Sequence, residues 1–227
     1  MKTNNVLNCL LLILLTLPLF GQQDNTGNWL MYFGTNKIHD QFSIHSEIQY
    51  RNHTVSPTNV EQLLLRTGLN YHFSDNAFVT AGYAYVPSYV FESEQRKPET
   101  TEHRIWQQFI SVQRIGRVKM EHRYRIEQRW INQEYKNRLR YRMMLFVPIN
   151  KPIIEKGSLF LGIYDEIFVH TKTSFFDRNR LYGALGYQFD KNTSLQVGML
   201  HQQLSDYGKW HVQFALFFNT DFTKKSN

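Results

Sequence analysis

The strongest constraint on the fold of this chain is an alternation of charged and apolar side chains with a period of two residues. It is clearest in KMEHRYRIEQRW (119–130), where every odd-numbered residue is charged and most even-numbered residues are apolar or aromatic. Successive side chains of an extended strand point to opposite faces, so all these charges share one face. The segment is therefore expected to be a β-strand with one charged face and one apolar face.

The same period recurs along the rest of the chain after residue 27, and no helical period of comparable length appears. The expected strands are 29–37, 41–53, 59–73, 77–90, 101–115, 117–131, 135–149, 159–171, 178–189, 193–204 and 209–222. Segments of this length can supply the roughly 9–11 residues that a tilted transmembrane strand needs. The pattern predicts an all-β chain with 10–12 strands.

The N-terminus predicts export from the cytoplasm. Lys2 precedes an apolar run from Val6 to Phe20, and Gly21 follows at the expected cleavage point. This arrangement is typical of a secretory signal peptide, and the run is shorter than the roughly 20 apolar residues of a membrane anchor. We therefore expect a signal peptide at 1–21, cleaved near Gly21, and one domain at 22–227. The only cysteine, Cys9, lies in the signal, so the mature chain would contain no thiol.

Aromatic residues near the strand ends add to the prediction of a membrane protein, because a transmembrane barrel has aromatic girdles at both interfaces. The candidates for the girdles are Trp29, Tyr50, Tyr71, Phe73, Tyr89, Trp106, Trp130, Phe189, Trp210 and Phe222. The mean hydropathy of −0.46 agrees with this class, since half of each barrel strand is polar. The predicted fold is a transmembrane antiparallel up-and-down β-barrel in the cell outer membrane.

Connector lengths predict the orientation of the barrel, with short turns in the periplasm and longer loops outside the cell. The short connectors are 73–77, 115–117 and 190–193, and the longer ones are 55–59, 91–101 and 171–179; the long segment 150–158 is an exception. The segments between 41 and 222 then form ten strands with both ends periplasmic. The remaining segment, 29–37, either joins the wall with a twelfth strand or runs inside the pore.

The charged faces are expected to line the lumen, because an arginine that faces lipid at mid-bilayer costs about 2–4 kcal/mol. The predicted lumen-lining ladder is Lys119, Glu121, Arg123, Arg125, Glu127, Arg129, Arg138, Arg140, Arg142, Glu166 and Arg180, and Glu47, Arg51, Arg66 and His170 are expected to share the lumen. The ladder either pairs internally and fills the barrel, or forms a cationic constriction that favours anionic solutes. Internal pairing is favoured because a narrow barrel usually fills itself, although the basic residues outnumber the acidic ones.

No catalytic constellation is expected, and neither a metal-site motif nor a cofactor motif occurs. The predicted function is a structural protein or narrow pore with an Arg/Glu-lined lumen. The alternative is an outer-membrane lipid-modifying enzyme that uses rim residues such as His201 and Ser205, which share one strand face. A soluble β-sandwich or lipocalin-like binder is a third possibility, but its many outward apolar faces would aggregate in water.

The formal net charge of +7 permits binding to anions, and an exported protein seldom meets nucleic acid. The expected partners are outer-membrane lipid, lipopolysaccharide and, during insertion, the barrel-assembly machinery. The protein is expected to be a monomer and to bind no nucleic acid.

Four segments carry a resemblance to a known family: HRYRIEQRW (122–130), RLRYR (138–142), YDEIF (164–168) and DRNRLYGALGYQF (177–189). They resemble the DUF2490 family of outer-membrane β-barrel proteins of unknown function, which is found mainly in Bacteroidota and other Gram-negative bacteria. The resemblance extends from Trp29 to Phe222. It implies the barrel and the location in the outer membrane, and it supplies neither a reaction nor catalytic residues.

Overall fold

The computed structural model describes residues 26–91, 97–171 and 175–223, so the predicted signal peptide lies outside the described residues. Every regular element in these segments is a β-strand. The strands are β1 (Thr26–Lys37), β2 (Phe42–Asn52), β3 (Val60–Ser74), β4 (Ala77–Ser88), β5 (Thr100–Ile115), β6 (Val118–Ile131), β7 (Glu134–Pro148), β8 (Leu159–His170), β9 (Phe176–Gln188), β10 (Thr193–Gln203), β11 (Gly208–Phe218) and β12 (Thr220–Asp221). No helix with the length and apolarity needed to cross a membrane occurs in the described segments.

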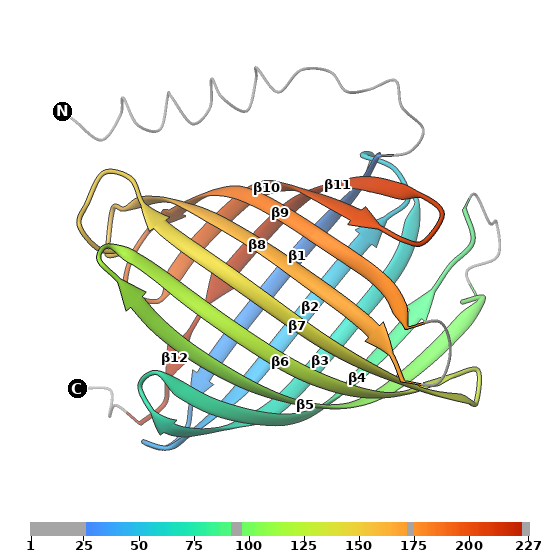
Figure 1. Cartoon of the computed structure of the whole chain (residues 1–227), viewed down its shortest axis with the longest axis horizontal. Helices are drawn as coiled ribbons and strands as arrows, with labels where there is room; N and C mark the ends of the chain where they lie inside the picture. The colour runs from blue at the N-terminus through green and yellow to red at the C-terminus, as the bar shows by residue number, and fades with distance from the viewer. Residues whose placement is uncertain (1–25, 92–96, 172–174, 224–227) are drawn as a thin grey trace.

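The sheet closes into a barrel of eleven strands (Figure 1). Each strand from β1 to β10 pairs antiparallel with the next strand in the chain, and β1 also pairs with β11. The short β12 follows β11 and pairs with Asn36 and Lys37 of β1. The predicted all-β barrel of 10–12 strands is thus confirmed, and the strand limits agree with the prediction to within a few residues.

The closing pair is parallel, because an odd number of up-and-down strands brings the first and last strands into the same direction. It aligns Thr26 with Trp210 and continues to Phe33 and Phe217. The segment 29–37 is β1, and it joins the wall between β2 and β11, as the first of the two predictions had it, rather than running inside the pore. The twelfth strand of that prediction is only the two-residue β12, so eleven long strands close the barrel. The prediction rested on an even strand number, which is the usual rule for such barrels.

The odd strand number also places the two ends of the described chain at opposite ends of the barrel. We call the end with the β3–β4, β5–β6 and β9–β10 connections the turn end, and the opposite end, with the β2–β3 and β4–β5 connections, the loop end. β1 begins at the loop end, whereas β11 finishes at the turn end. The ten strands from β2 to β11 begin and finish at the turn end, so the expectation that both ends of this ten-strand set lie on one side agrees with the structure; β1, which that set left out, is the strand that begins at the opposite end.

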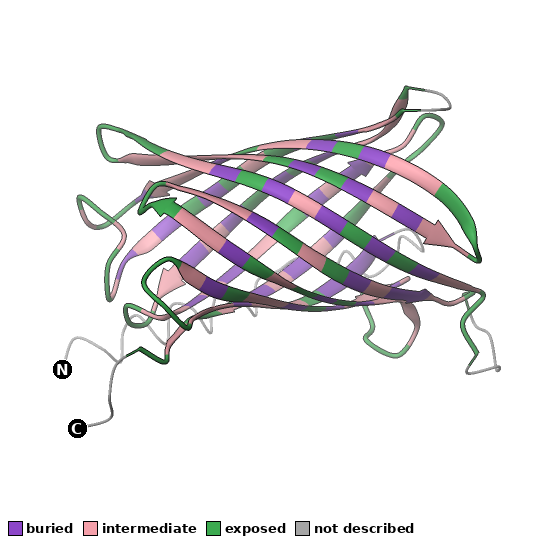
Figure 2. Cartoon of the chain, turned by 90° about the horizontal axis from the view of Figure 1, so that it is seen from below, coloured by how far each residue is buried: buried purple, intermediate pink, exposed green. Residues whose placement is uncertain are grey.

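The two-residue period separates an interior face from an exterior face along each strand, and Figure 2 shows buried and exposed residues in alternation. In β6, Arg125 and Glu127 are 3% and 0% exposed, whereas Tyr124 and Ile126 are 51% and 47% exposed. Asp165, which is out of step with the pattern of β8, lies on the outer face and accepts hydrogen bonds from the Asn179 side chain at 3.1 Å.

Turn chemistry explains where the strands reverse. Gly116 has φ +58° in the β5–β6 turn, and Asn132 and Gln133 both have positive φ in the two-residue β6–β7 hairpin. In the β9–β10 turn, the backbone N–H groups of Asn192 and Thr193 donate to the Asp190 carboxylate. These donors, that of Asn192 above all, hold the pKa of Asp190 below its usual range.

Replacing Gly116 with alanine is expected to lower the free energy of unfolding by about 1–2 kcal/mol, because L-residues are strained at positive φ. A Cβ at this position would meet no atom within 4 Å, so backbone strain is the only cost. Gly183→Ala is the matched control, since Gly183 also faces open space but lies in β9 without positive φ. Urea unfolding of the purified barrel measures both losses of stability; equal losses for the two variants would contradict the assignment of the turn.

Candidate functional site

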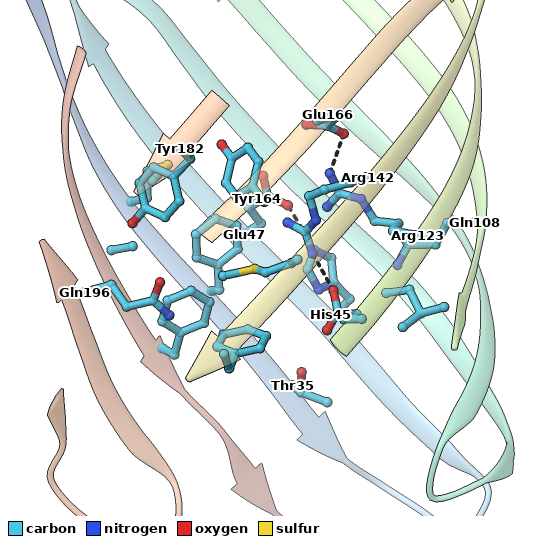
Figure 3. Close-up of a pocket in the computed structure, with 18 of the residues that line it drawn as sticks. Thr35, His45, Glu47, Gln108, Arg123, Arg142, Tyr164, Glu166, Tyr182 and Gln196 are labelled. Atoms are coloured by element: carbon cyan, nitrogen blue, oxygen red, sulfur yellow. Dashed lines mark hydrogen bonds and ion pairs between the residues drawn. The ribbon is translucent and has the colours of Figure 1, made fainter. Parts of the chain in front are cut away.

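The interior of the barrel contains a cavity of about 1010 Å³, to which all eleven long strands contribute lining residues. Sixteen of the residues that line it are lysine or arginine, and six are aspartate or glutamate. Figure 3 shows side chains from several strands pointing into this space, among them Glu47, Arg123 and Tyr164. The lumen is therefore the candidate functional site, and its lining has a large surplus of positive charge.

The structure brings the predicted ladder together in this lumen. The ladder residues that line the cavity are Lys119, Glu121, Arg123, Arg125, Arg129, Arg138, Arg140, Arg142, Glu166 and Arg180, together with Glu47, Arg51 and Arg66. Glu127 is fully buried against the wall and does not line the cavity. His170 is also outside the lining set, and its Nε2 lies 3.4 Å from the Asp177 carboxylate.

Glu127 is the centre of a continuous ion-pair network. It accepts hydrogen bonds from Arg138 and Arg140, each at 2.6 Å. Arg140 also donates to Glu166 at 2.8 Å, and Glu166 accepts a further bond from Arg123 at 2.6 Å. The network thus joins β6, β7 and β8 through side chains that face the lumen.

The network reaches the other side of the barrel through Arg66 of β3. Its Nη1 lies 2.8 Å from Glu47 of β2, and its Nη2 lies 3.9 Å from Glu127. A second cluster lies nearer the loop end, where Glu102 accepts hydrogen bonds from the Nε atoms of Arg104 and Arg129 at 2.5 Å. All these side chains are at most about one-tenth exposed, so they narrow the lumen where the clusters lie.

Three aromatic residues serve as platforms for the arginines. The guanidinium carbon of Arg125 lies 4.8 Å from the Trp106 ring centroid, and that of Arg140 lies 4.2 Å from the Phe168 ring. The guanidinium carbon of Arg51 lies 4.0 Å from the Trp29 ring centroid. Arginine suits such stacking because its planar guanidinium is weakly hydrated and is attracted by the ring face.

These platforms correct part of the predicted girdle. Trp29 and Trp106 are 3% and 0% exposed and lie on the inner face, so they are not interface residues. Position near a strand end suggested a girdle, but side-chain parity decides which way a ring points. Trp106 follows Arg104 by two residues and Glu102 by four, so all three side chains lie on the same face of β5. Because charged side chains face the lumen, this spacing could have identified Trp106 as an inward-facing residue. His103 and Gln107 on the opposite face obscured that parity.

Part of the positive charge in the lumen has no close anionic partner. Among the described residues no carboxylate pairs with Arg51, whose guanidinium donates to Gln49 and Gln62, or with Arg180, which donates to Gln202. Buried guanidinium nitrogens without a hydrogen-bond partner in the described chain are Arg66 Nε, Arg123 Nε, Arg125 Nη1 and Arg142 Nε. An unsatisfied buried donor costs about 1–3 kcal/mol, so an anion or water in the cavity would stabilise this arrangement.

The cavity opens toward the turn end. Its lining includes residues from connections at that end, such as Asp75, Arg117, Lys156 and Lys191. None of the described residues in the connections of the loop end lines it. The lumen therefore has a mouth among the turns, and the ion-pair clusters lie deeper within the barrel.

The alternative Ser–His pair is not joined in this structure. His201 packs its ring against Trp210, with centroids 4.7 Å apart, and Ser205 lies exposed in the β10–β11 connection. No hydrogen bond links the two side chains in the described part of the chain. Within the same residues, no group of three or more histidine, cysteine, aspartate or glutamate side chains is placed to hold a metal ion.

The fold and the lumen define a class of protein: a closed β-barrel of eleven strands with a basic, ion-paired interior. A family model described as "Protein of unknown function (DUF2490)" matches residues 26–213, which include ten of the eleven long strands and the first residues of β11. The chain belongs to the DUF2490 family. Comparisons with curated proteins and with solved structures found no match.

Replacing Glu127 with alanine is expected to lower the free energy of unfolding by about 3–5 kcal/mol, because Arg138 and Arg140 would stay buried without their shared carboxylate. The matched control is Glu134→Ala. Glu134 pairs with Lys136 at 3.2 Å, but its side chain is 70% exposed, so its loss should cost less than about 1 kcal/mol. Urea unfolding of the two purified variants provides the comparison, and a Glu127 effect no larger than that of Glu134 would contradict a stabilising network.

Proposed function

We propose that this protein is a non-catalytic β-barrel of the outer membrane and that its lumen is a narrow, anion-preferring passage. The observation that carries the proposal is the cavity itself, whose lining has sixteen basic and six acidic residues. Rings of arginine and lysine favour anionic solutes over cations in a pore. The ion-pair clusters restrict the width of the passage, so only small solutes would pass.

The exterior of the barrel supports a membrane location. Large apolar side chains are exposed on many strands, including Leu69 at 49%, Ile105 at 47% and Leu181 at 53%. Contiguous apolar surface of this kind is unfavourable in water and marks contact with lipid or with another protein. In the proposed orientation the turn end faces the periplasm, and β1 begins on the extracellular side.

Fractionation tests the location. The mature protein is expected in the outer-membrane fraction, and it should migrate differently on gels before and after boiling in detergent, because a closed hydrogen-bonded barrel resists unfolding. The loss of residues 1–21 is read from the mass of the mature protein. Recovery in the soluble periplasmic fraction, with no heat-dependent change in migration, would overturn the proposed location.

Recording in planar lipid bilayers tests the passage. The barrel is expected to conduct weakly and to prefer chloride to potassium. Arg125→Ala should reduce that preference and increase conductance, because Arg125 bonds mainly to Gln108 and its removal does not deprive a carboxylate of its main partner. Lys136→Ala, which removes a positive charge at the β6–β7 hairpin, is the control and should leave selectivity unchanged. Absence of conductance, or an anion preference that Arg125→Ala does not alter, would contradict the proposal.

A further inference from the structure

The half of the cavity nearer the turn end has an apolar wall, which is unusual for the interior of an aqueous pore. Phe33 of β1 stacks on Phe217 of β11 with ring centroids 5.0 Å apart. Phe146 of β7 and Phe160 of β8 lie 6.2 Å apart, and Met144 lies on the same face of β7. All five side chains line the cavity.

The wall accommodates one of these rings closely. A Cβ at Gly186 would lie only 2.2 Å from the Phe160 ring, so the absence of a side chain there allows the ring to lie against β9. Phe160 is 2% exposed as a result. This close packing indicates an ordered apolar surface inside the barrel.

Two arginines border this apolar wall on the side of the ion-pair network. Arg123 and Arg142 are direct neighbours across β6 and β7, and each has a buried Nε without a hydrogen-bond partner among the described residues. The guanidinium carbon of Arg142 lies 5.5 Å from the Tyr164 ring centroid. Figure 3 shows Arg123 and Arg142 close together, with Tyr164 between Arg142 and Tyr182.

We propose that this half of the lumen binds an amphipathic anion, namely a carboxylate or phosphate monoester attached to an apolar chain or ring. The anionic group would lie between Arg123 and Arg142, and the apolar part would lie along Met144, Phe146 and Phe160. This inference deepens the proposed anion-accepting lumen and rests on it. Small inorganic anions would satisfy the arginines but leave the half-buried rings of Phe33, Phe146 and Phe217 in contact with water, whereas an amphipathic anion would satisfy the arginines and cover apolar surface.

The direct test is calorimetric titration of the wild-type barrel in phosphatidylcholine nanodiscs, with empty nanodiscs as the blank. Octanoate is the probe, because it combines a carboxylate with a short apolar chain. It is expected to bind saturably, while acetate and octanol, which each lack one of the two features, should bind at least about tenfold more weakly. Octanoate heats equal to those of empty nanodiscs, or octanol binding as tight as octanoate binding, would overturn the proposal.

Two pairs of variants place the binding in this half of the lumen. Phe146→Ala should weaken octanoate binding, and Phe109→Ala, the same change on the outer face, should not. The double variant Glu121→Gln/Arg142→Gln removes the arginine together with its paired carboxylate, which protects the fold. This double variant should also bind octanoate more weakly than the wild type, whereas Lys136→Gln should bind it as tightly as the wild type. If the double variant does not fold, the phenylalanine pair decides: equal affinities for Phe146→Ala and Phe109→Ala would overturn the site.

Mass spectrometry of the purified wild-type barrel distinguishes the source of the natural ligand. A co-purified acid or phosphate of lipid origin would support the site and indicate the membrane as the source. Octanoate binding to a barrel that carries no such molecule would support a free solute. The outcome is also separable from that of the proposed passage: octanoate binding without conductance overturns only the passage, and anion-selective conductance without octanoate binding overturns only this inference.

Discussion

The buried carboxylate of Glu127 is the interaction on which the interior of this barrel depends. It is fully buried, and it neutralises Arg138 and Arg140 while Arg66 approaches it from another strand at 3.9 Å. Without this anion, the guanidinium groups of Arg66, Arg138 and Arg140 would repel one another at positions that are almost fully buried. Arg140 extends the network to Glu166 of the neighbouring strand β8, and Arg66 of β3 extends it to Glu47 of β2 on the other side of the lumen.

The network divides the lumen into two environments with different chemistry. Charged side chains and aromatic platforms occupy the depth of the barrel, and a phenylalanine- and methionine-rich wall lies nearer the turn end. The surplus of basic residues makes the whole cavity attractive to anions. In the proposed site, the apolar wall would add a preference for anions that carry hydrocarbon. The proposed passage and the proposed binding of an amphipathic anion would both use this one cavity, whose width the ion-pair network restricts.

The parallel contact between β1 and β11 sets the overall topology. It follows from the odd number of strands, and it places the start of β1 and the finish of β11 at opposite ends of the barrel. The connection is continued by β12 and by the Thr220 hydroxyl, which donates to the Asn36 side chain at 2.7 Å. Both predictions for segment 29–37 assumed that an even number of strands had to close the wall, and no local pattern in the sequence distinguishes a strand that closes in parallel from one that does not.

The sequence by itself determined the strands, their limits and, for most strands, which face points into the barrel. The reason is that side chains alternate between the two faces of a strand and that burying a charge in an apolar environment is costly. It also placed Arg125 and Glu127 on the same face. Only the tertiary structure decided which carboxylate each arginine meets, that Trp29 points inward, and that Phe33, far away in the chain, lies beside Phe217. Contacts of this kind depend on how the eleven strands close and in which register, which is a property of the whole sheet rather than of any one strand.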